Sequence, residues 1–466
     1  MTQHRRLWLI IQRPESIRFV SLSAGVLRET PPTTGIGYSR MSTEALRSPC
    51  SPTIVPSSNG GFSLVEVMIA MVLALVTFLI MFQMFENWDK NKRTTAGGTD
   101  SQITGAIAMY KLERDLRLAG FGFGSSPDLG CSVTAYDSQR PDQSASGLVS
   151  ATASHAFSFP LLPVQILNGA SGAPDQIAVL YGSSEQIRDT LGAPPATGFY
   201  STFVAAGAPF TETSAQAKKM AFGSRGGIQM GDLVLVAKSV SECGLVEITD
   251  NTNGDLRSID HKNSPNYTSF YTGASTAPRY NNPTGYNSGP GRIYVLGPTP
   301  QRRIWQITGG RTLSYINDLA WTGTSTNTPV EVSDNIVSLQ AEYGYAATVS
   351  GSGATATCVA STTTTWSATT HSTQCSHFIW AVRVAVLARS DQFEKTWGVL
   401  ADTAGAAVAP QWAGGSFGMT DVGGTSDSYT ATTSSTPSVN PADWRHYRYR
   451  VIETVIPLKN MMWGQR

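Results

Sequence analysis

The hydropathy pattern begins with one long apolar run. Between Leu64 and Phe85 the only ionisable side chain is Glu66. At about 1.5 Å per residue these residues make a helix of roughly 33 Å, against a hydrocarbon core of roughly 30 Å, so we expect a membrane span. A carboxylate near the centre of a span costs on the order of 2.5–3.5 kcal/mol, which makes Glu66 a functional candidate that needs a partner. The alternative is an ordinary single-pass anchor with a Glu near its end, where the cost is smaller.

Helical periodicity continues beyond the span. We expect the helix to run through residues 86–93 and to break or kink at Gly97-Gly98, because each glycine costs a helix interior roughly 1 kcal/mol. A second helical stretch is predicted over 101–118, ended by Gly120. It has a charged face (Lys111, Glu113, Arg114, Asp115 and Arg117) opposite a core-facing one. The core-facing positions recur at three- and four-residue spacing: Ile103, Ala106, Met109, Leu112, Leu116 and Ala119.

After Gly120 the pattern changes to short apolar runs bounded by Gly, Pro, Asn and Ser, which predicts strands. The predicted strands are 176–181, 232–237, 292–296, 336–343, 379–387 and a last one around 447–456. Periodicity alone also allows a buried helix over 379–387, but Val and Ile favour a strand. Two Ser/Thr-rich stretches, 361–374 and 423–442, are predicted to be exposed loops. We therefore expect an α+β chain in which a long N-terminal helix precedes a β-rich, mainly antiparallel domain.

Composition and charge point to export. Charged residues make up only 14% of the chain, a low share that is typical of extracellular β-rich proteins when Gly, Ser and Thr are abundant. Residues 1–61 hold seven Arg and three Glu, a net of +4, which leaves the remainder at −3 because the whole chain is +1. Basic residues before the span keep that end in the cytoplasm, so the long C-terminal part should be exported. Its net negative charge argues against DNA as a partner.

A motif stands at the start of the apolar run. The peptide Gly60-Gly61-Phe62-Ser63-Leu64-Val65-Glu66 resembles the processing site of type IV prepilins, in which a peptidase cuts after a glycine and the new N-terminal residue is methylated. The resemblance implies a cut between Gly61 and Phe62, with prepilin peptidase as a partner. It also implies that Glu66 acts in assembly, because in such filaments the glutamate neutralises the N-terminal amine of a neighbouring subunit.

The leader departs from that family's pattern. The basic residue nearest to the glycine is Arg47, whereas the family usually has Lys or Arg beside the glycine and a short leader. A start at Met41 gives a leader of ordinary prepilin length, and we expect residues 1–40 to be a mis-assigned start. An extended leader is the alternative.

Further landmarks resemble the PilW family of minor type IV pilins, mainly by their order along the chain. They are residues 114–121 followed by Cys131, residues 231–236 leading to Cys243, residues 380–390, and the closing segment 447–460. Residues 261–290 and 401–440 add nothing to this resemblance.

The cysteines suggest a disulfide framework. Cys50 lies in the leader, and the four exported cysteines permit three different pairings. An oxidising compartment favours disulfides over free thiols. No pair has Cys-x-x-Cys spacing, so we expect no metal site. We favour Cys131–Cys243, which follows the landmark order of the PilW resemblance, and Cys358–Cys375, which closes a short Thr/Ser-rich loop.

No catalytic frame is recognisable. The chain has no His-Glu-x-x-His, no Gly-x-Ser-x-Gly and no phosphate-binding Gly-rich loop with Lys, so we expect neither enzyme activity nor a cofactor. The exported histidines stand alone: His155, His261, His371, His377 and His446.

Two weaker patterns have simpler interpretations than a binding site. Residues 250–255 are rich in oxygen ligands but lack EF-hand spacing, so we interpret them as a solvated turn rather than a Ca²⁺ site. His446, Arg448 and Arg450 should share one side of a strand, which we interpret as a solvated face rather than a DNA contact.

These features predict a non-catalytic minor pilin that packs its helix with other minor and major pilins and helps to start or cap a type IV pilus, the kind of filament that serves adhesion and twitching motility. The expected parts are a leader (1–61), an apolar helix in the inner membrane (62–93), its amphipathic continuation (99–120) and a β-rich periplasmic or extracellular domain (121–466). Removing 61 of 466 residues leaves 405, a large pilin that suits a tip. The alternatives are a large pseudopilin of a type II secretion system, and an adhesin or enzyme that uses the pilin pathway only for export.

Replacing Gly61 by a bulky residue is expected to leave the precursor uncut and membrane-bound, because the glycine is the residue after which the peptidase cuts. Intact-mass analysis of the exported wild-type protein should give a chain that starts at Phe62. A mass that includes residues before Phe62 would contradict the assigned bond.

Overall fold

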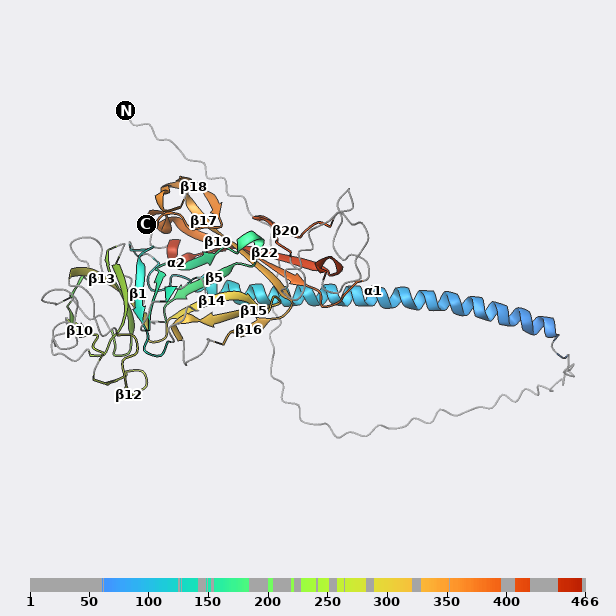
Figure 1. Ribbon diagram of the computed structural model, residues 1–466, viewed down its shortest axis with the longest axis horizontal. Helices are drawn as coiled ribbons and strands as arrows, with labels where there is room; N and C mark the ends of the chain where they lie inside the picture. The colour runs from blue at the N-terminus through green and yellow to red at the C-terminus, as the bar shows by residue number, and fades with distance from the viewer. Residues whose placement is uncertain are drawn as a thin grey trace, which may run out of the picture. The chain divides into compact units, whose positions relative to one another are not determined.

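The computed structural model contains one long helix at its N-terminal side, α1, which spans Leu64–Leu118 (Figure 1). The structure describes residue 61 and residues 63–462 apart from 125, 127, 141–147, 149, 152–154, 184–199, 204–218, 222–227, 240–241, 251–257, 264, 282–288, 321–327, 352, 395–406 and 420–442. The helix continues through 86–93 as predicted, but the predicted break at Gly97-Gly98 is wrong.

Close packing against a sheet explains one glycine inside α1, Gly105. A Cβ added there would lie 2.1 Å from Cδ1 of Ile452 and 3.1 Å from the Cβ of Ala388. Gly97 and Gly98 differ: a Cβ added to Gly97 would make ordinary contact with the Cβ of Ser390 at 3.5 Å, and one added to Gly98 would meet no atom within 4 Å. The helix passes through this pair because their low helix propensity, roughly 1 kcal/mol each, is outweighed by the helix on both sides and its tertiary contacts.

The C-terminal half of α1 buries the predicted core positions Met109, Leu112, Leu116 and Ala119. The prediction is wrong at Ile103, which is 54% exposed, and at Ala106, which is also exposed. The helix ends at Leu118, as predicted, and Gly120 follows with φ +78°, a left-handed conformation that glycine adopts without strain.

Asp115 is the one charged residue of the predicted polar face that is fully buried, at 1% exposure. Both of its carboxylate oxygens accept hydrogen bonds from Nη1 of Arg303 at 3.1 Å, and Oδ2 also accepts one from Nε1 of Trp305 at 3.2 Å. A buried carboxylate is tolerated where it is paired and hydrogen-bonded in this way.

The largest sheet follows α1 in the sequence. Its spatial order is β10-β7-β6-β13-β8-β9-β1-β3-β2, and among the described pairs only β1 with β9 is parallel. The strands are β1 Ser132–Tyr136, β2 Ser150–Ala151, β3 Ala156–Pro160, β6 Tyr200–Phe203, β7 Lys219–Ala221, β8 Leu233–Ser239, β9 Glu242–Glu247, β10 Ser258–Asp260 and β13 Gly289–Gly297.

Two further sheets lie along the C-terminal half of α1 (Figure 1). The second has the order β16-β15-β14-β5-β4, and the third has the order β18-β17-β19-β22. Their strands are β4 Val164–Leu167, β5 Gln176–Tyr181, β14 Gln301–Thr308, β15 Thr312–Asn317, β16 Val330–Ser333, β17 Ile336–Ser350, β18 Thr357–Ser367, β19 Ile379–Arg389 and β22 Tyr449–Pro457.

Small elements complete the described chain. Two hairpins pair β11 Tyr267–Thr268 with β12 Ser275–Thr276, and β20 Gln411–Trp412 with β21 Gly415–Ser416. The short helices are η1 Ala170–Gly172, η2 Asp318–Ala320, η3 Gly353–Thr355, η4 Thr373–Phe378, η5 Trp444–His446 and α2 Lys459–Met462.

The predicted fold class is confirmed: a long apolar helix precedes a β-rich, mostly antiparallel domain. All six predicted strands are present, as β5, β8, β13, β17, β19 and β22. The predicted loop 361–374 is wrong in its first half, because residues 361–367 belong to β18. Its threonines are β-branched and fit a strand paired with β17. The other predicted loop, 423–442, lies outside the described residues.

Asp175 joins the second sheet to the third. It precedes β5, and its amide donates to the carbonyl of Leu339 in β17 at 2.7 Å. Its carboxylate accepts amide hydrogen bonds from Gly169 at 2.8 Å and Ala341 at 2.7 Å. Burial disfavours the charged form, and this effect outweighs the amide bonds, raising the pKa of Asp175 to about 6.

This pKa predicts a pH dependence of stability. Between about pH 4 and pH 6 the folded chain keeps a proton on Asp175 that the unfolded chain has released, so the free energy of unfolding should fall as pH rises. A shift of about 2 pKa units corresponds to roughly 3 kcal/mol. Urea unfolding of wild type and Asp175→Asn, measured from pH 4 to pH 7, should show a steeper fall in wild type, because groups such as Asp232, whose pKa burial also raises, remain in both proteins. Parallel curves for the two proteins would contradict it.

Candidate functional site

The start of α1 holds the predicted processing and assembly residues. Gly61 is described and exposed, whereas Phe62 lies outside the described residues. The carbonyl of Ser63 accepts hydrogen bonds from the amides of Glu66 at 2.9 Å and Val67 at 3.2 Å, which starts the helix. A Ser followed three residues later by Glu is typical of a capping box, and a carboxylate in the first turn favours the helix dipole. Ser63 is a residue that the sequence analysis missed, although this spacing signals it.

Glu66 lies on an apolar face of the helix. Its side chain shares that face with Val67, Ala70, Met71 and Ala74, and it is exposed. A carboxylate among such neighbours is readily reached by a group from outside the chain. The structure therefore leaves room for the partner that the sequence analysis assigns to Glu66.

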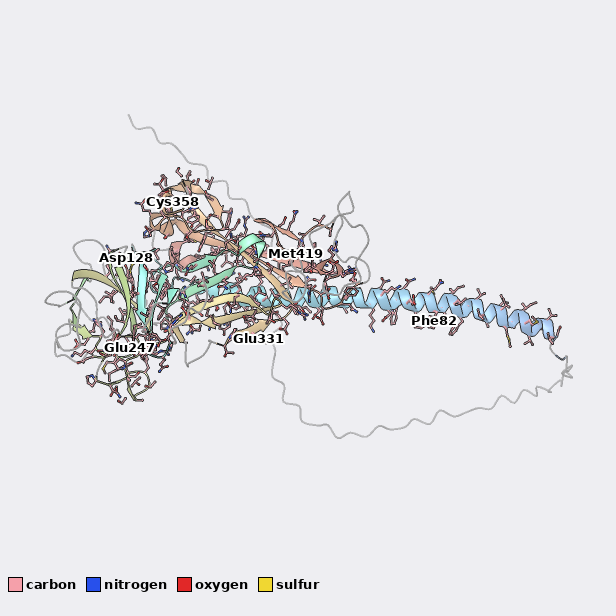
Figure 2. The ribbon with its side chains drawn as sticks, in the orientation of Figure 1. Phe82, Asp128, Glu247, Glu331, Cys358 and Met419 are labelled. Atoms are coloured by element: carbon pink, nitrogen blue, oxygen red, sulfur yellow. A yellow bond between two sulfur atoms is a disulfide. The ribbon has the colours of Figure 1, made fainter. Side chains whose placement is uncertain are left out.

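The first half of α1 exposes apolar side chains all around its circumference, and Figure 2 shows Phe82 as one of them, 59% exposed. The helix is long and apolar enough to cross a membrane, and none of its most apolar window is buried within the chain. Burying one such side chain is worth about 1.5–3 kcal/mol, so this surface requires an apolar environment outside the chain. The exposed residues include Leu64, Val65, Met68, Ile69, Met71, Val72, Leu73, Leu75, Val76, Phe78, Leu79, Ile80, Met81, Met84 and Phe85.

Polar groups mark the end of the apolar stretch. Lys90 forms an exposed ion pair with Glu86 at 3.7 Å, and Nζ of Lys92 lies 5.5 Å from the ring centroid of Trp88. Trp beside Lys is typical of the boundary between hydrocarbon and water. The apolar surface therefore has the length of one membrane crossing.

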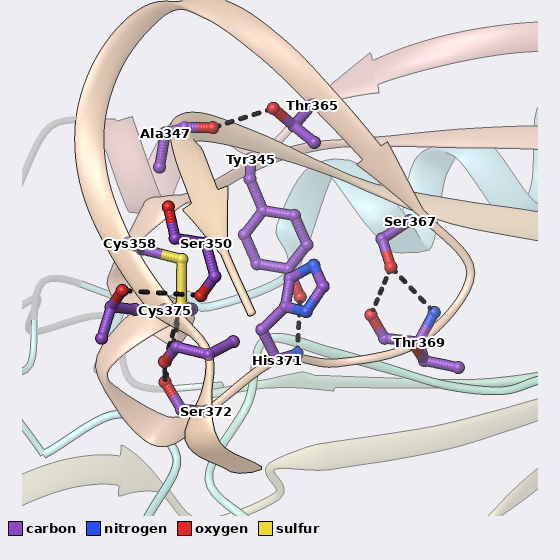
Figure 3. Close-up of a disulfide and its surroundings, with 12 residues drawn as sticks. Tyr345, Ala347, Ser350, Cys358, Thr365, Ser367, Thr369, His371, Ser372 and Cys375 are labelled. Atoms are coloured by element: carbon purple, nitrogen blue, oxygen red, sulfur yellow. Dashed lines mark hydrogen bonds between the residues drawn. A yellow bond between two sulfur atoms is a disulfide. The ribbon is translucent and has the colours of Figure 1, made fainter. Parts of the chain in front are cut away.

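The two predicted disulfide pairs are the ones that the structure forms. Cys131 is bonded to Cys243 with a Cα–Cα distance of 6.0 Å, and this bond lies beside the parallel pairing of Val133 with Cys243. Cys358 is bonded to Cys375 with a Cα–Cα distance of 5.3 Å. Figure 3 shows this second bond joining β18 to η4, where Ser372 donates a hydrogen bond to the carbonyl of Ala356 at 2.5 Å.

The polar candidates at the C-terminal end do not form one face. His446 is completely buried in η5, with its ring stacked 4.6 Å from that of Phe393. Arg448 forms an ion pair with Glu394 at 2.5 Å, and Arg450 is exposed. The prediction that His446, Arg448 and Arg450 share one side of a strand is therefore wrong for His446, because the chain turns before β22 begins.

The remaining candidates are the oxygen-rich segment 250–255 and the other histidines. Asp250 forms an isolated bridge with Asp260, and 251–257 lie outside the described residues. Across the described part of the chain, no group of three His, Cys, Asp or Glu side chains is arranged to hold a metal ion. Burial lowers the pKa of His371 and His377. His155 and His261 are not brought together with the other histidines by any described contact.

Two family models match this chain. Residues 56–82 match the prokaryotic N-terminal methylation motif, which contains Gly61, Phe62 and Glu66. Residues 311–460 match the type IV pilus-assembly protein W family, PilW. No curated protein and no solved structure matches the chain.

A methylation motif that leads into an exposed apolar helix, followed by a β-rich domain, is the arrangement expected of a prepilin-type protein. The second match points to one kind of pilin: together the two matches are similar to a PilW-type minor pilin, and they confirm the predicted resemblance. The PilW match covers the third sheet and the Cys358–Cys375 disulfide. The landmarks at 114–121 and 231–243 lie outside it, so their likeness to the family stays a prediction.

Removing the smaller disulfide is expected to destabilise the protein without unfolding it. A closed loop of about this size contributes on the order of 3 kcal/mol. The double variant Cys358→Ser and Cys375→Ser should therefore unfold at lower urea concentration, and non-reducing peptide mapping of wild type should recover Cys131–Cys243 and Cys358–Cys375 as linked peptides. A peptide that links Cys131 to Cys358 or Cys375 would refute the pairing.

Proposed function

We propose that this chain is a non-catalytic minor pilin that is cut at Gly61–Phe62 and then assembles through its N-terminal helix into a type IV pilus. The observation that carries the proposal is the junction of the methylation motif with a helix whose apolar side chains are exposed all around. Such a helix is stable first in the inner membrane and then among the helices of other pilins. Its partners in this proposal are other minor and major pilins, and prepilin peptidase.

Charge pairing gives the assembly step its register. Cutting before Phe62 creates a cationic amine at the new N-terminus, and Glu66 lies one turn further along on an exposed apolar face. At about 4 Å and an effective dielectric constant near 20, opposite charges attract by roughly 4 kcal/mol. This gain offsets the cost of about 2.5–3.5 kcal/mol for a carboxylate in the membrane. Glu66 of one subunit and the amine of the next would thus favour one axial offset between helices.

The size of the exported domain supports a place at the pilus tip. Three large sheets follow α1, and the largest core cluster joins them to the C-terminal half of the helix; a domain of this bulk is tolerated where it need not repeat along a shaft. The basic leader supports the orientation, since it places the N-terminus in the cytoplasm and the β-rich domain in the periplasm before assembly.

The test removes the charge of Glu66 while keeping the helix. Glu66→Val should insert, be cut and form both disulfides, but it should recover partner pilins at least about tenfold less well in co-purification, because the charge pair is lost. Glu86→Val is the matched control, since it removes an exposed carboxylate from the same helix beyond the apolar stretch. If Glu66→Val co-purifies with pilins and restores pili in a deletion strain as well as wild type does, the proposed role is wrong.

A further inference from the structure

The β11–β12 hairpin differs from the rest of the domain in composition. Residues 263–278 contain no Asp, Glu, Lys, Arg or His and consist mainly of Asn, Ser, Thr and aromatic residues. The hairpin pairs Tyr267 with Thr276 and Thr268 with Ser275, and Figure 1 shows β12 near β10. It lies outside the part of the chain that matches the PilW family. Membership in that family therefore does not account for it.

Buried carboxylates hold the hairpin at its base. Tyr267 is buried, and its hydroxyl donates a hydrogen bond to Glu247, which Figure 2 labels. The hydroxyl of Tyr271 donates to Oδ1 of Asp232 at 2.5 Å. Both carboxylates are nearly inaccessible, with Glu247 6% and Asp232 3% exposed. Two side-chain anchors on β9 and on the residue before β8 thus fix the orientation of the hairpin.

Backbone contacts add to this. The amide of Phe270 donates to the carbonyl of Met230 at 3.0 Å, and the amide of Gly273 donates to the carbonyl of Ser269 at 2.9 Å. A Cβ added to Gly231, whose φ is +99°, would lie 3.1 Å from Oγ of Ser269. The loop therefore rests directly on the backbone beneath it and holds its tip in one conformation.

The tip presents two aromatic rings to solvent. Phe270 is 62% and Tyr271 47% exposed, and the rings meet edge to face at 5.4 Å and 90°. One exposed aromatic residue is ordinary on a protein surface. Two adjacent rings on a loop fixed by buried carboxylates are already ordered, so a ligand that stacks on them incurs little entropic cost in binding.

We propose that the β11–β12 hairpin is a binding site for a neutral saccharide, with Phe270 as the stacking surface and Tyr271 as its side wall. The ring of Phe270 offers an apolar face to the C–H groups of a sugar. Hydroxyl and amide side chains in the same hairpin, on Asn266, Thr268 and Ser275, are exposed and match sugar hydroxyls as donors and acceptors. The absence of charged residues from 263–278 selects an uncharged ligand.

The size of the surface favours a sugar over a protein. Eleven of the described residues between 265 and 277 are exposed, whereas a stable protein interface takes roughly 20–30 residues from each side. A few sugar units fit a surface of this size. Weak single contacts are effective where many copies or repeated sugar units are engaged together.

The test measures retention of the purified full-length protein on beads of immobilised neutral polysaccharides: cellulose, chitin, starch, dextran and mannan. The detergent must be a polyoxyethylene ether, since a glucoside or maltoside head group would compete. We expect retention on at least one polysaccharide. Retention should be unchanged at 0.5 M NaCl, where the Debye length of about 4 Å screens electrostatic attraction. Phe270→Leu removes the aromatic ring and should lower retention at least about tenfold, whereas Phe270→Tyr keeps the ring and should be retained as well as wild type. Val359→Ala changes an exposed valine in β18 and should have no effect.

Several outcomes would overturn the proposal. They are retention on none of the beads, retention that salt abolishes, and retention that Phe270→Leu leaves unchanged. A parallel assay on cell surfaces treated with periodate or with protease distinguishes a protein ligand: loss of Phe270-dependent binding after protease alone would show that the hairpin contacts a protein. Both assays use purified protein, so their outcome is independent of whether the chain assembles into a pilus.

Discussion

The packing of the C-terminal half of α1 against the second and third sheets is the contact on which the described domain depends. Gly105 lets Ala388 of β19 and Ile452 of β22 approach the helix backbone, and Gly97 contacts Ser390, the residue after β19. Lower down the same helix, Asp115 binds Arg303 and Trp305 of β14. Gly105 sets the distance of the helix from the third sheet, and the buried ion pair of Asp115 joins the helix to the second. Substituting Gly105 would therefore disturb the third sheet, and substituting Asp115 the second.

The sequence predicted whether a long element is a helix or a strand better than it predicted what that element contacts. Strands such as β5 and β19 were predicted because short runs of Val, Ile and Leu bounded by turn residues are typical of strands. The break at Gly97-Gly98 was wrong because helix propensity is a local quantity of roughly 1 kcal/mol per glycine, whereas the half of the helix that follows packs against a sheet formed by residues about 300 positions later. Asp115 looked like a surface residue for the same reason, since its partner Arg303 is distant in sequence.

Some parts of the candidate site could be predicted from the sequence and others could not. Gly61, Phe62 and Glu66 lie close together in one short motif, and such a motif can be recognised without knowing the fold. The disulfides were chosen from landmark order and loop length, and β1, which begins directly after Cys131, is a neighbour of β9, which carries Cys243. His446, by contrast, was placed on a strand by its alternation with tyrosines, but Asp443 accepts the amide of Arg445 and turns the chain into η5 just before β22. The side-chain cap thus places His446 in a short helix instead of the strand, and the alternation of residue types does not reveal this.

Three carboxylates show how differently this chain treats a costly charge. Asp115 is paired with a guanidinium from β14, and Asp175 is held by two backbone amides while burial raises its pKa. Both carboxylates therefore have their partners within the chain. Glu66 lies among exposed apolar side chains at the start of α1, and the most apolar stretch of that helix is not buried within the chain. Because the other two carboxylates are satisfied inside the fold, Glu66 is the one of the three whose cost has to be met from outside the chain, and the proposed contact with the N-terminal amine of a second subunit would meet it.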